Sequence, residues 1–322
     1  MVTLCNDFII DTEEMRYAYC DALIAAASKN PRIVSVDCDL SSSCGTGRFA
    51  ETFPDRTINV GIAEQNGCAM AGGLSASGMI PFFHSFSVFS TRRVYDQVFL
   101  SCAYAGQNVK IIGCDAGVSA AYNGGTHMAF EDANIMRVLP QVTVLEPTDS
   151  VMMHSIVEQM ADTYGVFYMR MPRKQVHRIY ENGSTFEIGK GVILRDGADV
   201  SIIANGMEVI EALWAADMLL KEGIRATVVD MFTTKPVDIE CILECARKTG
   251  AIVTAENCLI NGALGSAVAE VLCENYPTPM QRIGILDRFG EVGPIDYLKE
   301  TFCITAPHIV DAAKKTIARR GI

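Results

Sequence analysis

The chain has 322 residues, of which 49% are hydrophobic and 20% are charged, and its formal net charge is −11. This length and hydrophobic content suffice for a large core and predict about two domains. An acidic chain without runs of lysine or arginine is a poor candidate for binding a phosphate backbone, so nucleic acid is excluded as an expected partner.

The N-terminus lacks a basic segment followed by a long apolar one, so we expect no signal peptide. The stretch from Gln65 to Thr91 contains no residue that is charged at pH 7 and exceeds the length of a membrane span. Its polar residues, Pro81 and its glycines favour a buried helix, a turn at Gly78 and a strand. The twelve cysteines form no C-x-x-C pair. We therefore expect free thiols, no metal site and a cytoplasmic protein without membrane contact.

In the first half of the chain, helices and strands alternate. Residues 11–14, Asp-Thr-Glu-Glu, resemble a capping box and predict a helix that continues to about Lys29. Strands separated by helices predict a parallel, doubly wound sheet with helices on both faces. The expected strands are 32–37, 79–83, 109–113, 142–147 and 165–170, and the further expected helices are 64–77, 92–105, 131–139 and 149–162.

The alternation breaks between residues 173 and 198, where short β-like pieces contain several glycines, and then resumes. Further strands are expected at 199–204, 225–230 and 251–256, and helices at 207–223, 239–250 and 265–276. The sequence thus predicts an α/β fold with two doubly wound domains, residues 1–172 and 199–322, joined by a connector, residues 173–198.

Ligands of open α/β sheets bind beyond the carboxyl ends of the strands. In the first domain this places the expected site in four loops, residues 37–47, 59–65, 84–89 and 114–127. Glu64 lies in one of them, at the start of the long uncharged stretch. It is either a helix N-terminal carboxylate that complements the helix dipole, or a carboxylate in a dry pocket that shares a proton with a ligand nitrogen. The absence of a nearby basic residue in sequence favours the second interpretation.

Two aromatic residues and a histidine lie in the other loops. Phe86 and Phe89 are either core residues or a stacking surface for a flat heterocycle. His127 follows Gly124-Gly125-Thr126 and is either a hydrogen-bonded structural residue or a functional one in a glycine-rich loop.

Three further residues are expected at element ends on the ligand side, namely Arg16, Ser43 and Arg170. A single arginine of this kind is usually part of a surface ion pair. If the three side chains converge at one sheet edge, they form a phosphate site.

Several motifs resemble the transketolase family. "INVGIAEQNGCAMAGGLSASGMIPFFHSF", "RRVYDQV" and "GGTHMAFEDANIMR" resemble the pyrimidine-binding domain of transketolases and deoxyxylulose-phosphate synthases. The segments from "DVSIIANGMEVIEAL" to "GALGSAVAEVL" resemble their C-terminal domain. The resemblance covers nearly the whole chain and implies the C-terminal subunit of a transketolase that is encoded as two chains.

The resemblance implies roles for individual residues. Glu64 matches the glutamate that hydrogen-bonds the aminopyrimidine of thiamine diphosphate, and Phe86 and Phe89 match the pocket around that ring. His127 matches a histidine that contacts sugar hydroxyls near the reacting carbon. Arg16, Ser43 and Arg170 match groups that grip a phosphorylated acceptor, and Asp39 matches a structural aspartate.

Two positions depart from the family pattern. Asp115 stands where the family usually has histidine, and Asn123 stands where it has aspartate. Both positions line the sugar-binding side in the family. The resemblance therefore implies retained cofactor chemistry with an unusual or narrowed donor or acceptor.

The Gly-Asp-Gly segment with which the family holds the diphosphate and its metal has no match here, and "RDGAD" resembles a turn. The resemblance thus implies that a partner, the N-terminal transketolase subunit, holds the diphosphate and Mg²⁺ (or Ca²⁺ or Mn²⁺), in a heterotetramer with two chains of each kind. Two alternatives remain. One is the β chain of a 2-oxoacid dehydrogenase E1, which "NVGIAEQ" and "GGTH" disfavour, and the other is a non-catalytic subunit that retains the fold.

Overall fold

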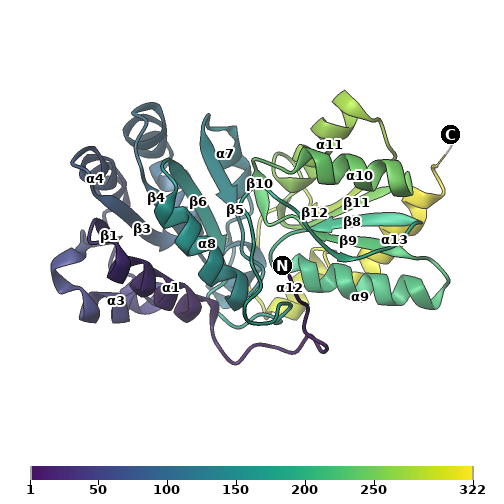
Figure 1. The fold of residues 1–322 in the computed structure, drawn as a ribbon, viewed down its shortest axis with the longest axis horizontal. Coiled ribbons are helices and arrows are strands. Elements are labelled where there is room, and N and C mark those ends of the chain that lie inside the picture. Colours follow the sequence, from purple (N-terminus) through teal and green to yellow (C-terminus); the bar gives the residue numbers. More distant parts are fainter. Residues whose placement is uncertain (1, 321–322) are drawn as a thin grey trace.

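A computed structural model describes residues 2–320 and shows two β-sheets side by side, each covered by helices (Figure 1). The sheet in the first half has seven strands in the order β10-β5-β6-β4-β3-β1-β2. All neighbouring strands are parallel except β10, which pairs antiparallel with β5. The strands are β1 (Ile33–Asp37), β2 (Thr57–Asn59), β3 (Ile80–Phe86), β4 (Lys110–Cys114), β5 (Val142–Leu145), β6 (Val166–Met171) and β10 (Thr233–Lys235).

Helices cover both faces of this sheet because its central strands are buried and need apolar partners on each side. On one face α1 and α8 pack against each other (Figure 1). On the other face, a second apolar cluster includes residues from α4, from α7 and from the helical turns that follow β3. The helices are α1 (Met15–Lys29), α2 (Ser41–Cys44), α3 (Gly47–Thr52), α4 (Glu64–Ala76), α5 (Ser87–Ser90), α6 (Tyr95–Gln97), α7 (Asp132–Val138) and α8 (Ser150–Asp162).

The second sheet has five strands in the order β12-β11-β8-β9-β7, and only β7 is antiparallel to its neighbour. Helices α9 and α13 pack together on one face, and α10 and α11 on the other (Figure 1). The strands are β7 (Val192–Arg195), β8 (Val200–Ala204), β9 (Ala226–Asp230), β11 (Ile252–Leu259) and β12 (Met280–Ile285). The helices are α9 (Glu208–Lys221), α10 (Ile239–Thr249), α11 (Leu264–Asn275), α12 (Ile295–Thr301) and α13 (Ala306–Ile317).

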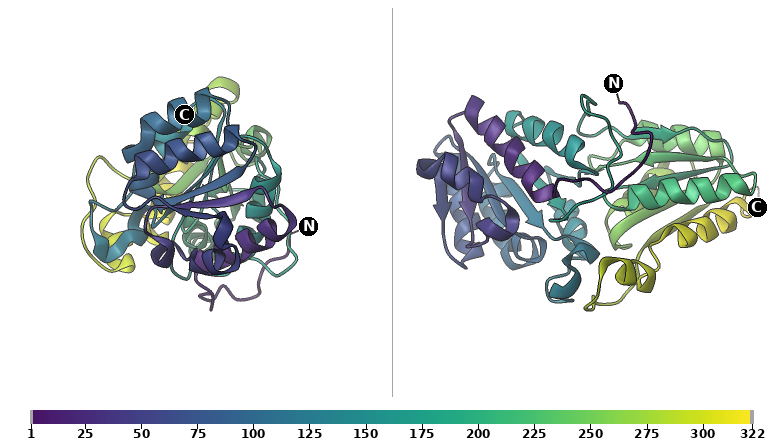
Figure 2. Two further views of the ribbon diagram at one scale, coloured as in Figure 1. Left: turned by 90° about the vertical axis from the view of Figure 1, so that its left-hand side faces the viewer. Right: turned by 90° about the horizontal axis from the view of Figure 1, so that it is seen from below.

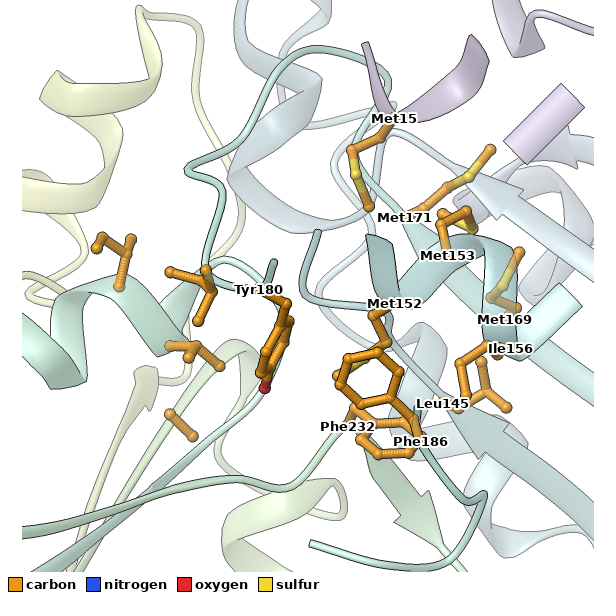
Figure 3. Packing of buried hydrophobic residues seen from close by; sticks show 14 of the residues in the cluster. Met15, Leu145, Met152, Met153, Ile156, Met169, Met171, Tyr180, Phe186 and Phe232 are labelled. Atoms are coloured by element: carbon orange, nitrogen blue, oxygen red, sulfur yellow. The ribbon is translucent and has the colours of Figure 1, made fainter. Parts of the chain in front are cut away.

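The two halves are joined by more than the chain connection. The N-terminal segment runs from α1 to the second half (Figure 2) and forms isolated bridges with the connector, Leu4 to Tyr180 and Ile10 to His177. One apolar cluster extends from the methionines of α8 and β6 to Phe186 and Phe232 (Figure 3). The domains therefore share a continuous core.

The predicted α/β fold with two doubly wound domains is confirmed, and most expected elements lie within a few residues of their predicted bounds. The capping box is wrong. Helix α1 begins at Met15 without a side-chain cap, because Asp11 is buried and accepts hydrogen bonds from the Glu13 amide and the Ser150 hydroxyl. The helix expected at 92–105 consists of a 3₁₀ turn, α6 and a π-helical segment from Val98 to Tyr104.

Within residues 2–320, no helix is both long and apolar enough to cross a membrane. The uncharged stretch instead forms α4, β3 and α5. Its one histidine, His84, is fully buried between Tyr19 and Ser35, and burial lowers the pKa of His84 to about 4. His84 is therefore neutral at pH 7, in agreement with a stretch that carries no charge at this pH.

Candidate active site

Glu64 is the first residue of α4 and is only 4% exposed. The turn before it depends on Gly61, whose φ of 71° lies in the left-handed region that favours glycine. The Asn59 side chain fixes this turn by accepting hydrogen bonds from the amides of Gly61 and Asp39. Its amide group also donates to the Asp39 carboxylate, which agrees with a structural role for Asp39.

The Glu64 carboxylate has a charged partner, contrary to the expectation from the sequence. The Arg93 guanidinium donates to its Oε1 at 2.7 Å. Arg92 and Arg93 are the first charged residues after the uncharged stretch. The chain passes through α4 and β3 and then places Arg93 beside the start of that stretch. The two ends of the uncharged sequence thus meet in space.

An aromatic cluster adjoins this ion pair. The guanidinium carbon of Arg93 lies 3.7 Å from the centre of the Phe89 ring, an arrangement that favours the cation. The rings of Phe89 and Phe86 have centroids 6.3 Å apart. The His127 ring meets both edge to face, at 5.2 Å from Phe89 and 6.0 Å from Phe86. The structure therefore brings together Glu64, both phenylalanines and His127, which come from three different loops.

The Phe86 ring also adjoins a polar group. The guanidinium carbon of Arg173 lies 5.3 Å from the Phe86 ring centre, and its Nε lies 2.6 Å from Asp115 Oδ2. The Asn123 amide donates to the same Asp115 oxygen at 3.3 Å. Burial raises the pKa of Asp115, while Arg173 and the more distant Arg16 oppose that rise. The two positions that depart from the family pattern are thus in direct contact.

Arg16 and Ser43 lie next to each other at the start of α1 and in α2. The Arg16 guanidinium donates to the backbone carbonyls of Ser42 and Ser43 and pairs with the Glu14 carboxylate at 2.6 Å. Glu14 also pairs with Lys174. Arg16 therefore contacts the backbone of Ser43, and the arginine already has an anionic neighbour in Glu14.

Arg170 does not join them. Its side chain is 1% exposed, and its guanidinium pairs with Asp132 at 2.8 Å and with Glu146 at 2.9 Å. The remaining nitrogen donates to the backbone carbonyls of Ala129 and Asn257. The expectation that Arg170 grips a substrate phosphate is therefore wrong, because all its nitrogens are engaged inside the protein.

A cavity of about 540 Å³ lies between the two halves of the chain, beside the contact of Asp115 with Asn123. Asn123 and Arg173 contribute to its wall from the first half, and Ile295 and Lys299 of α12 contribute from the second half. Of the candidate site residues, Asn123 and Arg173 line this cavity, whereas Glu64, Phe86, Phe89 and His127 do not.

The residues present fit the pyrimidine part of thiamine diphosphate, because a buried carboxylate and an aromatic pair adjoin one another at the carboxyl edge of the sheet. Among residues 2–320, no group of three His, Cys, Asp or Glu side chains is arranged to hold a metal ion.

The comparisons with known proteins agree with this geometry. The family description "Transketolase, pyrimidine binding domain" matches residues 11–178, and "Transketolase, C-terminal domain" matches residues 189–309. The 6-deoxy-6-sulfo-D-fructose transketolase subunit SqwH of Clostridium sp. (strain MSTE9) is 48% identical over 316 residues, which cover 98% of each chain. A subunit of the apulose-4-phosphate transketolase of Phocaeicola vulgatus is 37% identical, over 84% of this chain and 87% of that protein.

A solved structure described as "Split gene transketolase, inactive beta4 tetramer" has a TM-score of 0.88 at 43% identity and covers 95% of this chain and 99% of its own. The transketolase of Rattus norvegicus is 35% identical over 99% of this chain, but the match covers only 51% of that protein. The chain belongs to the transketolase family, whose pyrimidine-binding and C-terminal domains it carries. It is thereby a transferase chain of the kind found in separately encoded transketolase subunits, which confirms the resemblance.

Two residues of the site were missed at the level of sequence. The signal for Arg93 was the pair Arg92-Arg93, which directly follows the uncharged stretch and offers the first cationic partner for Glu64 along the chain. Arg173 lies three residues after Arg170, just beyond the end of β6. Its position at the strand end, rather than within the strand, is the signal that separates an arginine of the site from a buried one.

Proposed function

We propose that the chain forms half of a thiamine-diphosphate-dependent transketolase, which transfers a two-carbon ketol unit between sugar phosphates. The observation that carries this proposal is the nearly buried Glu64 carboxylate beside Phe89, Phe86 and His127. A helix N-terminal carboxylate that only complemented a dipole would need no aromatic neighbours of this kind.

In this proposal Glu64 shares a proton with a ring nitrogen of the aminopyrimidine, and Phe86 and Phe89 orient the ring and exclude water from it. When bound, thiamine diphosphate would supply the chemistry for breaking and forming the carbon–carbon bond, which the protein's own side chains cannot provide. The Arg93 guanidinium holds the carboxylate in place through its hydrogen bond to Glu64 Oε1.

On the sugar side, His127 contacts the hydroxyls near the reacting carbon, and Asp115, Asn123 and Arg173 select the substrate. In this proposal Arg16 and Ser43 bind the anionic end group of the substrate. A relative at 48% identity is named for a sulfonated ketose, which supports testing a ketose whose terminal anion is a sulfonate as well as a phosphate.

The partner in this proposal is an N-terminal transketolase subunit that holds the diphosphate and Mg²⁺, or Ca²⁺ or Mn²⁺ in its place, with two copies of each chain. The description of a similar β4 tetramer as inactive supports the need for a second kind of chain. All twelve cysteines are free, which supports a reducing compartment such as the cytoplasm.

The test mixes the chain with a candidate N-terminal subunit, thiamine diphosphate and Mg²⁺, and measures ketol transfer from a panel of ketose phosphates and 6-deoxy-6-sulfo-D-fructose. We expect transfer from at least one donor only when both chains are present. Calorimetry of the isolated chain is expected to show weak thiamine diphosphate binding. Tight Mg²⁺-dependent binding by this chain alone, or decarboxylation of a 2-oxoacid by the mixture, would overturn the proposal.

A further inference from the structure

The loop that carries Asn123 and His127 has its two ends side by side in the first half of the chain. A backbone bridge joins Ala116 to Ala129, and the Gly117 amide donates to the Ala129 carbonyl at 3.0 Å. Residues 117–128 form a long loop that extends away from the sheet. The position of this loop therefore depends on the residues against which it packs.

The apolar side chains of this loop pack in the other half of the chain. Val118, Met128 and Phe130 belong to a cluster whose further members include Leu298 and Phe302, from α12 and the turn after it. The Phe130 and Phe302 rings meet edge to face at 5.1 Å. The loop with the proposed sugar-binding residues thus has its core in the C-terminal domain.

Backbone hydrogen bonds fix the base of the loop to the same domain. The Val118 amide donates to Asn257 Oδ1 at 3.0 Å, and the Leu259 amide donates to the Phe130 carbonyl at 2.8 Å. Asn257 and Leu259 both belong to β11. These bonds place the two ends of the loop, whereas its tip needs a separate support.

The tip is supported by a segment that follows β12, residues 288–293, which we call the 288–293 segment. A Cβ atom on Gly125 would lie 2.2 Å from the carbonyl oxygen of Gly290, and one on Gly290 would lie 3.1 Å from the Cα of Gly125. A Cβ atom on Gly124 would lie 2.8 Å from Val292 Cγ2. The glycines before His127 therefore touch this segment with their backbone and leave no space for a side chain.

The tip also has a conformation that needs support. Ala121 has φ 47° and ψ −114°, which an L-residue with a side chain rarely adopts, and Gly124 has φ 74°. Such backbone geometry persists only where surrounding contacts over-determine it. On the cofactor side, by contrast, Glu64 and Arg93 take their positions from α4 and the turn after α5, within the first half.

We propose that the 288–293 segment of the C-terminal domain is a positioning element for sugar binding, which holds His127 and Asn123 through Gly124 and Gly125. The inference rests on the proposed function for the meaning of those two residues. It gives the C-terminal domain a part in substrate selection, and it separates sugar binding from cofactor activation.

Two variants test the proposal in the assembled complex. Val292→Ala removes the contact with Gly124, and because Val292 is 63% exposed the change costs little folding stability. Gly290→Ala places a methyl group 2.6 Å from Met128 Sδ and pushes the loop away. Asp287→Ala is the control, since this exposed residue lies just outside the segment.

We expect both variants to lower kcat/KM by about 10- to 100-fold, mainly through a higher KM for the sugar, since a displacement of about 1 Å costs up to about 10²-fold. Deuterium exchange at the thiazolium carbon should stay at the wild-type rate, and Asp287→Ala should change neither quantity. Unchanged KM in both variants, or an equal loss in thiazolium exchange, overturns the proposal.

Amide hydrogen exchange of the isolated chain separates this inference from the proposed function. Residues 117–128 should exchange faster in Val292→Ala and Gly290→Ala than in the wild type, while α4 exchanges at the same rate. If the wild-type complex transfers no ketol unit, the proposed function fails, and this measurement still decides whether the segment holds the loop. Unchanged exchange in both variants shows that it does not.

Discussion

The Arg93 guanidinium lies 2.7 Å from the Glu64 carboxylate, although the two residues are 29 positions apart in sequence and those from 65 to 91 are uncharged. The carboxylate side chain is 5% exposed and the arginine side chain is 41% exposed. The ion pair therefore sits at the boundary between the protein interior and the surface, where a ligand nitrogen can approach the carboxylate.

Glu64→Gln is expected to impair formation of the reactive cofactor. Glutamine keeps the shape and can still form a hydrogen bond, but it cannot share the proton in the same way. Positioned proton transfer contributes about 10² to 10⁴ in rate, and we expect a loss in that range in thiazolium deuterium exchange of the assembled complex. The control is Glu158→Gln on the surface of α8. Wild-type exchange in Glu64→Gln would leave Glu64 with only its helix-end role.

Arg93→Met is expected to destabilise the isolated chain more than the loaded complex. In the isolated chain it leaves a nearly buried carboxylate without its donor, at a cost of about 1–3 kcal/mol. In the complex the ligand nitrogen supplies a second partner for Glu64. Urea unfolding of both forms measures the difference, with Arg92→Met as control, whose exposed pair with Glu131 contributes about 0–1 kcal/mol. An equal loss in both forms would contradict a ligand at Glu64.

Asp115→His combined with Asn123→Asp is expected to shift substrate preference toward common pentose phosphates. The two wild-type side chains share a hydrogen bond and Arg173 pairs with Asp115, so the double change alters one connected polar group. The measurement is kcat/KM across the donor panel, with thiazolium exchange as the reference for an intact cofactor side. Equal ratios across all donors would show that these positions do not set specificity.

Arg170→Met is expected to lower the free energy of unfolding by about 3–5 kcal/mol, because it leaves the Asp132 and Glu146 carboxylates buried without a cation. Urea unfolding of the isolated chain measures this loss. Arg195→Met, which removes a partly exposed partner of Asp217, is the control and should cost far less. A stable Arg170→Met protein with a higher KM for phosphorylated sugars would restore the original substrate role of Arg170.

Glu208 is expected to make a contribution to stability that is lost as pH rises. Burial raises the pKa of Glu208 to about 8, against the effect of Lys299 and with that of Glu211 and Glu146. The folded state thus holds a proton that the unfolded chain releases near pH 4.5, so this contribution is complete below pH 4.5 and is lost as pH rises through about 8.

Glu208→Gln should flatten this dependence by up to about 1.4 kcal/mol per pH unit between about pH 5 and pH 8, since the amide resembles the protonated acid. Urea unfolding at several pH values measures the slope, and the exposed Glu274→Gln serves as control. The same slope in Glu208→Gln and wild type would show that Glu208 is ionised in the folded state.

The sequence predicted those helices and strands whose positions depend on short-range patterns of apolar and polar residues. The β-branched runs and apolar periodicities located β1, β8 and α9 within a residue or two, since burial on a strand or helix face has a fixed period. Glu64, Phe86, Phe89 and His127 became candidates because strand ends mark the ligand edge of the sheet. Their convergence could not be derived from spacing alone, because three separate loops bring them together.

The wrong predictions concern residues whose roles are determined by contacts with residues far away in the sequence. Asp11 resembles a cap in sequence, but the Ser150 hydroxyl, far along the chain, donates to its carboxylate. Arg170 resembles an exposed strand-end arginine until Asp132 and Glu146 enclose it. The connector, by contrast, was expected to hold short β-like pieces, and it contains β7 and the isolated bridges at His177 and Tyr180.

Strand β10 has a consequence for how the two halves can be handled. It belongs to the second half of the sequence, yet it pairs with β5 at the margin of the first sheet. Without it, β5 would present unpaired backbone groups to solvent, which is the template on which chains stack into aggregates. A gene fragment that encodes only the first half should therefore yield insoluble protein. In the full chain, β10 from the second half covers the edge strand β5 and so prevents self-association through this edge.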